Sequence, residues 1–169
     1  MNTLTAPPVI RRAQSRDLEV VGELTVAAYS HDGHVEDSEP YLEELRAAGE
    51  RAERAELWVA TLDDQVVGSV TFCPEGSPYR ELASAGEGEF RMLAVAPETR
   101  GRGVARALVQ RCLARSRELE CSSVVLCSMP TMTSAHRLYE SFGFSRDPDL
   151  DWEPAPGVVL WGYRADIGT

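Results

Sequence analysis

The stretch RGRGVA, which begins at Arg100, carries the clearest chemical signal in this chain. Gly101 and Gly103 allow the backbone to approach a ligand closely, and an apolar-faced helix pattern starts directly after Gly103. The first amides of a helix have no partner inside the helix, and its dipole favours negative charge there. We therefore predict a phosphate or diphosphate site, with charge added by Arg100, Arg102 and Arg106. An ordinary strand-to-helix turn with surface arginines explains the same residues equally well.

Two common nucleotide-binding loops do not match this stretch. A P-loop needs a lysine and then Ser or Thr at the helix start, where Val104 and Ala105 stand. A dinucleotide fingerprint needs a third Gly or Ala three residues after Gly103, where Arg106 stands. It also needs an acidic residue at the end of the next strand, where Ser128 stands. Both nucleotide interpretations are therefore disfavoured.

Predicted strands and helices position this loop. An alternating stretch from Glu89 predicts the strand that enters it, and Pro97 ends that strand. The β-branched run at 122–128 is typical of a buried strand, and a helix around 133–142 follows until Gly143 stops it. Further strands are predicted at 9–13, 56–62, 66–72, near Phe144 and at 158–164. An amphipathic helix is predicted from Ser15 or Asp17 and a second helix at 41–54, with a loop at 73–88 and a connection at 147–156. The order indicates a mixed α/β domain whose first half contains a hairpin.

Length and charge limit the possible classes of protein. The chain has 169 residues, which fits a single domain over 1–169 that needs neither disulfides nor a structural metal. Its net charge of −10 argues against binding nucleic acid or an anionic membrane. The opening residues lack the apolar run of a signal peptide, and no later stretch approaches the roughly 18 apolar residues of a membrane span. We expect a cytoplasmic protein.

The four cysteines lack the CxxC spacing of a zinc or redox site. Cys73, Cys112, Cys121 and Cys127 all lie inside apolar patterns. We therefore predict buried free thiols and no metal site.

Two motifs together resemble the GCN5-related N-acetyltransferase (GNAT) family. The loop matches the family's Arg/Gln-x-x-Gly-x-Gly/Ala pattern, and the later helix matches its Leu-Tyr followed by Gly-Phe. The matching residues are Arg100, Gly103, Ala105, Ala135, Leu138, Tyr139, Gly143 and Phe144. The order of elements also resembles that fold along nearly the whole chain, which implies a mixed, mostly antiparallel central sheet of about seven strands flanked by about four helices.

The resemblance implies acetyl-CoA as the acetyl donor and direct attack of an amine on its thioester. In such enzymes the strand before the loop, here Leu93, Ala94 and Val95, pairs its backbone with the pantetheine arm. The diphosphate-binding stretch would be Gly101, Arg102, Gly103, Val104, Ala105 and Arg106, with Arg100 before it. An amide-rich pantetheine suits a strand edge, and a charged diphosphate suits a helix start.

Tyr139 occupies the family's usual position for the acid that protonates the leaving thiolate. A phenol with a pKa of about 10 carries its proton at neutral pH, so it can donate to sulfur. The alternative is a tyrosine packed in the core.

The general base is less well defined by the sequence. Glu89 stands where some family members place a base, eleven residues before Arg100, and Glu87 on the same strand face is the second candidate. The alternative is that both glutamates are solvated acidic residues at the start of a strand and that water is the base. Cys127 stands where other members carry a base glutamate, and we expect a structural cysteine there. A lone histidine such as His136 is more often structural than catalytic.

The sequence leaves the acceptor and some contacts open. Met132 stands where the family commonly has an asparagine, so one cofactor contact is in doubt. The regions expected to bind the acceptor are acidic, and they contain Glu36, Asp37, Glu39, Glu43, Glu44, Asp147, Asp149, Asp151 and Glu153. These carboxylates favour a cationic amine as the acceptor, or they serve only to keep the protein soluble. The partners we expect are acetyl-CoA and an amine-bearing small molecule or protein amine. A homodimer is also compatible with the sequence. An inactive CoA-binding regulatory domain is the alternative function.

Overall fold

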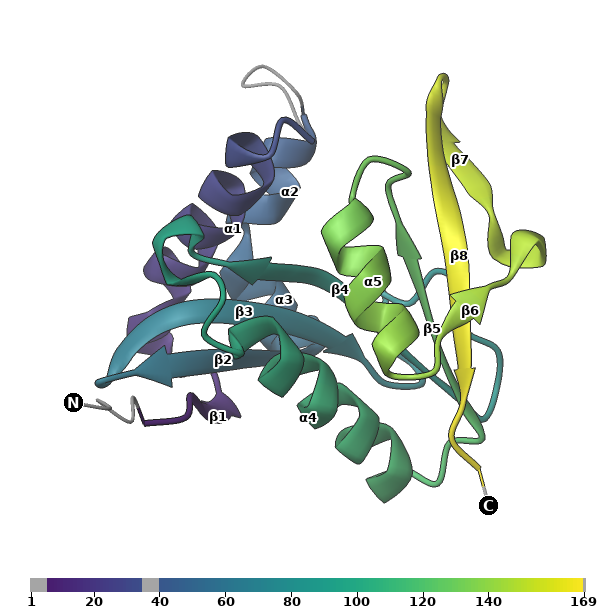
Figure 1. Ribbon diagram of the computed structural model, residues 1–169, viewed down its shortest axis with the longest axis horizontal. Coiled ribbons are helices and arrows are strands. Elements are labelled where there is room, and N and C mark those ends of the chain that lie inside the picture. Colours follow the sequence, from purple (N-terminus) through teal and green to yellow (C-terminus); the bar gives the residue numbers. More distant parts are fainter. Residues whose placement is uncertain (1–5, 35–39, 169) are drawn as a thin grey trace. The chain divides into compact units, whose positions relative to one another are not determined.

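The computed structural model describes residues 6–34 and 40–168 (Figure 1). Within them the chain forms eight strands: β1 (Val9–Arg12), β2 (Glu56–Leu62), β3 (Gln65–Cys73), β4 (Glu87–Val95), β5 (Ser123–Ser128), β6 (Ser145–Arg146), β7 (Trp152–Ala155) and β8 (Val158–Asp166). The α-helices of the same residues are α1 (Leu18–His31), α2 (Tyr41–Arg46), α3 (Ala48–Arg54), α4 (Val104–Glu118) and α5 (Thr133–Ser141). Short 3-10 turns lie at Ser15–Asp17, Pro97–Thr99 and Pro148–Leu150.

Contacts between residues divide the chain into two compact units. The first contains Met1–Thr71 and Met92–Arg111, and the second contains Phe72–Arg91 and Cys112–Thr169. Strands β3 and β4 and helix α4 contribute residues to both units. The single domain expected over 1–169 stays a prediction.

The strand pairings confirm a mixed, mostly antiparallel sheet. In the first unit the order is β1-β2-β3-β4, and in the second it is β4-β5-β8-β6 with β7 also paired to β8. The β4–β5 pair is parallel, whereas the β1–β2, β5–β8, β6–β8 and β7–β8 pairs are antiparallel. The parallel β4–β5 pair needs a crossover connection, which α4 supplies.

Two features of the structure were not predicted from the sequence. The segment 147–156, expected to be a connection, contains the short strand β7. The helix expected over 41–54 divides into α2 and α3 at Ala47, whose ψ of 56° is not helical. Neither feature has a strong local signal, because β7 contains Pro154 and the 41–54 segment has no Pro and carries its one Gly, Gly49, inside α3.

The core of the first unit forms where α1 meets the sheet. Val21 packs with Leu57 and Val59 of β2, all of them buried. A second cluster joins Leu24 and Ala28 of α1 to Ala94 and Ala96, with Tyr29 packed against it. The end of α1 therefore lies on the end of β4. On α4, Val104 packs so closely on β3 that a Cβ at Gly68 would come within 2.7 Å of its side chain.

Helix α5 and the paired strands build the core of the second unit. Tyr139 of α5 makes an edge-on ring contact with Phe90 of β4 and a tilted one with Tyr163 of β8. Strand β5 is buried throughout except at Cys127. Among the residues with described structure, no helix has both the length and the apolar character that crossing a membrane requires.

The structure corrects the prediction that all four cysteines are buried. All four are free, and Cys73 and Cys112 are buried, but Cys121 and Cys127 are only half-buried. Cys121 follows the end of α4, and Cys127 lies next to the end of β5, where it is the one position of that strand that is not fully buried.

Candidate active site

The glycine loop leaves the end of β4 and opens α4. A 3-10 turn at Pro97–Thr99 leads into an extended Arg100, after which Gly101 and Gly103 have left-handed φ values of 81° and 78°. A Cβ on either glycine would meet no described heavy atom within 4 Å, so the space over the loop is open. The Ala107 amide makes the first hydrogen bond of α4, to Gly103 O at 3.1 Å. The amides just before it stand at the helix start, where an anion is favoured.

The strand segment before the loop, residues 93–95, follows the part of β4 that pairs with β5. Pairing of β4 with β5 covers Glu87, Gly88 and Glu89. Met92 then adopts a left-handed φ of 54°, which is rare for a non-glycine residue and typical of an interruption or bulge in a strand. Residues 93–95 come after this break. Their backbone is therefore a candidate strand edge for pairing with a ligand. The structure holds these residues and the loop in one unit.

Arg100 makes a paired interaction that the sequence does not indicate. Its Nη1 donates to Asp32 Oδ1 at 2.7 Å, and its Nη2 donates to Asp32 Oδ2 at 2.7 Å. The hydrogen bond to Arg100 lowers the pKa of the Asp32 carboxyl, and the same contact raises the pKa of Arg100. Arg102 has an exposed side chain on the loop, and Arg106 has one in the first turn of α4. The charge of Arg100 is thus already balanced by a carboxylate.

Tyr139 is held by an aromatic cluster in the second unit. The residue is only 6% exposed. Its ring lies 5.9 Å from Phe90, 6.0 Å from Phe144 and 6.2 Å from Tyr163, measured between ring centroids. These ring contacts fix the direction of the Tyr139 ring. The side chain is therefore rigidly placed, as a core tyrosine or a catalytic acid would be.

His136 lies one turn before Tyr139 and is bound to β5 and the residue after it. Its Nε2 is 3.1 Å from Ser128 Oγ and 3.1 Å from Met129 O. The ring also stacks at a tilt on Trp161 and Tyr163. Burial lowers the pKa of His136, so the neutral form is favoured at neutral pH. These contacts agree with a structural histidine.

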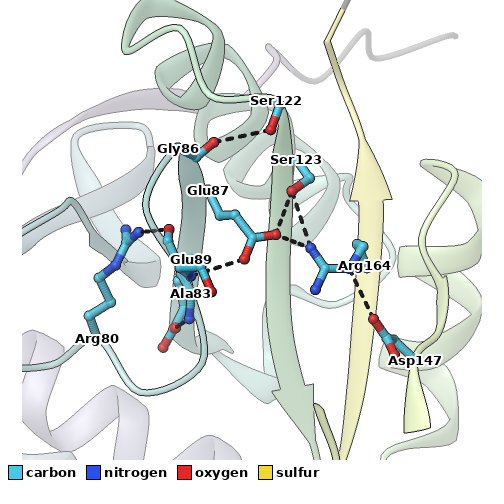
Figure 2. Close-up of polar contacts among 10 residues, drawn as sticks. Arg80, Ala83, Gly86, Glu87, Glu89, Ser122, Ser123, Asp147 and Arg164 are labelled. Atoms are coloured by element: carbon cyan, nitrogen blue, oxygen red, sulfur yellow. Dashed lines mark hydrogen bonds and ion pairs between the residues drawn. The ribbon is translucent and has the colours of Figure 1, made fainter. Parts of the chain in front are cut away.

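Glu89 is a buried carboxylate enclosed by backbone amides. The residue is 1% exposed, and its Oε1 accepts the Leu82 amide at 2.7 Å and the Ala83 amide at 2.9 Å. The Glu81 amide adds bonds to Oε1 at 3.2 Å and to Oε2 at 3.0 Å. Figure 2 shows Glu89 and Ala83 side by side, where the loop after β3 returns to β4. Successive amides of this kind form an anion-binding concavity, filled here by the chain's own side chain.

The second base candidate, Glu87, belongs to an ion-pair network (Figure 2). Its Oε2 accepts the Ser123 hydroxyl at 2.6 Å and pairs with Arg164, while its Oε1 accepts the Ser84 amide at 2.9 Å. Arg164 also donates from Nε to Asp147 Oδ2 at 2.9 Å. The network links β4, β5 and β8, so Glu87 already has a structural task.

Several of the predicted acidic acceptor residues already have partners. Glu43 pairs with Arg46 at 3.0 Å, and Asp151 binds Arg146 through both carboxylate oxygens. Glu153 accepts the Gly157 amide. Glu36, Asp37 and Glu39 lie outside the described residues. These pairings weaken the expectation of a strongly anionic acceptor pocket.

The structure distributes the predicted site residues between its two units. Leu93, Ala94, Val95 and the stretch from Arg100 to Arg106 lie in the first, and Glu89 and Tyr139 lie in the second.

The half-buried Cys127 has its pKa raised to about 11 by burial, so its thiol stays protonated near pH 7. Sequence reasoning missed Asp32, which is 68 positions from Arg100 and has no motif to mark it.

A mixed sheet with an interrupted strand, a glycine loop and an open helix start defines an α/β protein that can bind a phosphate-bearing ligand. The model of the acetyltransferase (GNAT) family matches residues 13–144, and the chain belongs to this family. Three similar proteins illustrate the relationship.

N-acetylaspartate synthetase of Danio rerio is 36% identical over 103 residues, covering 61% of this chain and 34% of that protein. Human N-acetyltransferase 8B is 36% identical over 114 residues, covering 67% and 46%. The solved structure of PaiA N-acetyltransferase from Thermoplasma acidophilum, in complex with coenzyme A, has a TM-score of 0.74 at 15% identity and covers 96% of this chain and all of that one. The chain thus spans about a third of the length of the N-acetylaspartate synthetases that it matches.

Proposed function

We propose that this protein is an N-acetyltransferase that uses acetyl-CoA to acetylate a primary amine. The observation that carries the proposal is the open loop at the start of α4, with Gly101 and Gly103 in left-handed conformations and no described atom over them. Membership of the GNAT family supports it, as does the coenzyme A complex of the Thermoplasma neighbour. Residues 101–106 would hold the diphosphate through their amides, and the backbone of residues 93–95 would pair with pantetheine.

The reaction needs proton transfers that the chain must supply. Acetyl-CoA contributes a thioester, and attack by a neutral amine forms the C–N bond while the C–S bond breaks. The amine nitrogen loses one proton, and the departing sulfur gains one. Tyr139 is our proposed donor to sulfur, because it holds the family position for that acid and its ring is fixed by packing.

Glu89 is the proposed acceptor of the amine proton, either directly or through water. Its Oε1 accepts three of the four amide bonds, so Oε2, which accepts one, is the oxygen through which it would act. Because the amides also anchor the loop, the structure gives Glu89 a second task that is independent of catalysis. Glu87 is less favoured, because Arg164, Ser123 and Ser84 already occupy its carboxylate.

The acceptor is proposed only as a primary amine. The name of the Danio rerio relative, N-acetylaspartate synthetase, suggests testing L-aspartate. The acidic segments instead favour cationic amines, although several of their carboxylates pair with arginines. Protein N-termini and lysines complete the classes to be tested, and longer acyl-CoA donors test the acyl group.

Release of CoA thiol measures the proposed activity directly. The protein is incubated with acetyl-CoA and, separately, L-aspartate, polyamines, aminoglycosides and peptides, and acetyl-CoA affinity is measured by calorimetry. Amine-dependent thiol release supports the proposal. Tight acetyl-CoA binding without release for any acceptor class supports the alternative, an inactive CoA-binding domain, and absence of binding overturns both.

A further inference from the structure

Arg100 and Asp32 form an ion pair with the geometry of two parallel hydrogen bonds. The two nitrogen–oxygen distances are both 2.7 Å, which matches the strong fork-to-carboxylate arrangement. We propose that Arg100 acts as a tether that holds the end of α1 beside the cofactor loop, while the diphosphate is bound by loop amides. The inference rests on the proposed acetyl-CoA site, and it assigns Arg100 a positioning role instead of a phosphate contact.

The position of Asp32 supports a tertiary role. It is the C-terminal cap of α1, where the helix dipole makes a negative charge unfavourable. An aspartate there does not stabilise its own helix. Its carboxylate gains instead from Arg100, which approaches from the residue just before the glycine loop. The side chains of Asp32 and Arg100 are 31% and 42% exposed, so the pair lies at the surface of the first unit.

Apolar contacts hold the same end of α1. Ala28 and Tyr29 belong to the cluster that includes Ala94 and Ala96 at the end of β4. Turn bonds then continue the helix end, from the Gly33 amide to Ser30 O and from the His34 amide to Tyr29 O, both at 3.1 Å. The ion pair and the apolar cluster therefore both hold the last turn of α1. Together they place it on the strand segment proposed to bind pantetheine.

The charges on the loop fit this division of tasks. Arg102 lies exposed between the two glycines of the loop, whereas the guanidinium of Arg100 is bound by the Asp32 carboxylate. Recruiting Arg100 to a phosphate would break both hydrogen bonds to Asp32 and leave that carboxylate at a helix C-terminus beside the more distant His34 Nε2, 3.9 Å from Oδ2. A tether and a phosphate ligand therefore respond differently when Asp32 is changed.

The test compares Asp32→Asn, Arg100→Gln and the charge-reversed double variant Asp32→Arg with Arg100→Asp. Hydrogen exchange of residues 29–34 in the ligand-free protein reports the tether, and calorimetry with acetyl-CoA reports the site. Glu23→Gln is the matched control, because it removes a different α1 ion pair, to Arg46, in the same unit. Arg100→Lys keeps the charge but not the two-bond geometry, and thermal unfolding checks that each variant folds.

We expect both single variants to speed exchange at 29–34 by about two- to fivefold, the range of a surface ion pair. They should weaken acetyl-CoA binding by similar small factors, the control should change neither, and charge reversal should restore both to within about threefold. A large affinity loss in Arg100→Gln with none in Asp32→Asn, or a reversed pair that binds worse than Arg100→Gln, overturns the tether. Failure of the unaltered protein to bind acetyl-CoA overturns the proposed function, while the exchange data still decide the tether.

Discussion

The Glu89 carboxylate accepts the backbone N–H of Leu82 at 2.7 Å, and thereby joins the middle of β4 to the loop that follows β3. Arg91, two residues along the same strand, reinforces this link through Tyr79 O at 3.2 Å and the Glu81 carboxylate at 3.1 Å. The loop is thus anchored by one anion and one cation from the same face of β4. A catalytic role for Glu89 must be measured against this anchoring role.

Replacing Glu89 by Gln separates the two roles. The amide group of Gln presents donors to backbone donors, so we expect the free energy of unfolding to fall by about 1–3 kcal/mol. If Glu89 is also the base, kcat falls by about 10²–10⁴-fold. Urea unfolding and turnover measurements report these two effects, with Glu87→Gln as the control for a second, half-buried carboxylate of β4. A variant that loses stability but keeps its kcat refutes the base and leaves the anchor.

Tyr139→Phe tests the proposed acid while retaining the ring contacts with Phe90 and Phe144. We expect kcat to fall by about 10²-fold or more, because general acid catalysis is lost. The affinity for acetyl-CoA, measured by calorimetry, should stay within about twofold, because the backbone loop is unchanged. Tyr163→Phe, another buried tyrosine of the same aromatic cluster, is the control. Unchanged turnover in Tyr139→Phe would remove this residue from the mechanism.

Gly103→Ala tests the loop. Its φ of 78° makes any Cβ unfavourable, and we expect a loss of about 1 kcal/mol in folding stability. The added methyl also stands in the open space where the diphosphate is proposed, so the affinity for acetyl-CoA should fall at least about tenfold. Gly76→Ala is the matched control, since its φ is 92° and its surroundings are also open. Equal calorimetric affinities in the two variants would contradict the proposed cradle.

Asp17 makes folding stability depend on pH. It is 4% exposed and accepts Arg11 at 2.6 Å and the Gln14 amide at 2.7 Å. The bond to Arg11 lowers its pKa from the ordinary 3.8, so the unfolded chain binds the proton more readily. Stability is therefore complete above that value and falls as pH drops through the lower native pKa.

We expect Asp17→Asn to be less stable than the unaltered protein at pH 7 and to lose less stability on acidification from pH 5 to pH 2. Urea unfolding at a series of pH values measures the difference. Asp149→Asn, at an exposed position, should leave the acid dependence unchanged. Parallel pH curves for Asp17→Asn and the unaltered protein would show that the Arg11 pair contributes nothing to the acid limb.

Local features explain how much of the fold was predictable. Period-two and helical patterns, glycine stops and the loop motif predicted the order of the main elements and the mixed sheet, because each depends on neighbouring residues. The division at Ala47 and the short β7 strand were missed. The β7 strand carries Pro154, which disfavours a strand, although it pairs with the nearby β8, Trp152 with Leu160. The division at Ala47 has no Pro or Gly to mark it, and both α2 and α3 pack on α1.

The sequence by itself determined the family, the glycine loop before α4 and the places of Tyr139 and Glu89 in the chain, since motif spacing and backbone preference are properties of short segments. Only the tertiary structure decided what those side chains touch. It brought Asp32 to Arg100 across 68 positions and folded the Leu82 amide onto Glu89. Charged and polar side chains take whichever partner the fold brings within hydrogen-bond range, and no local pattern encodes that choice.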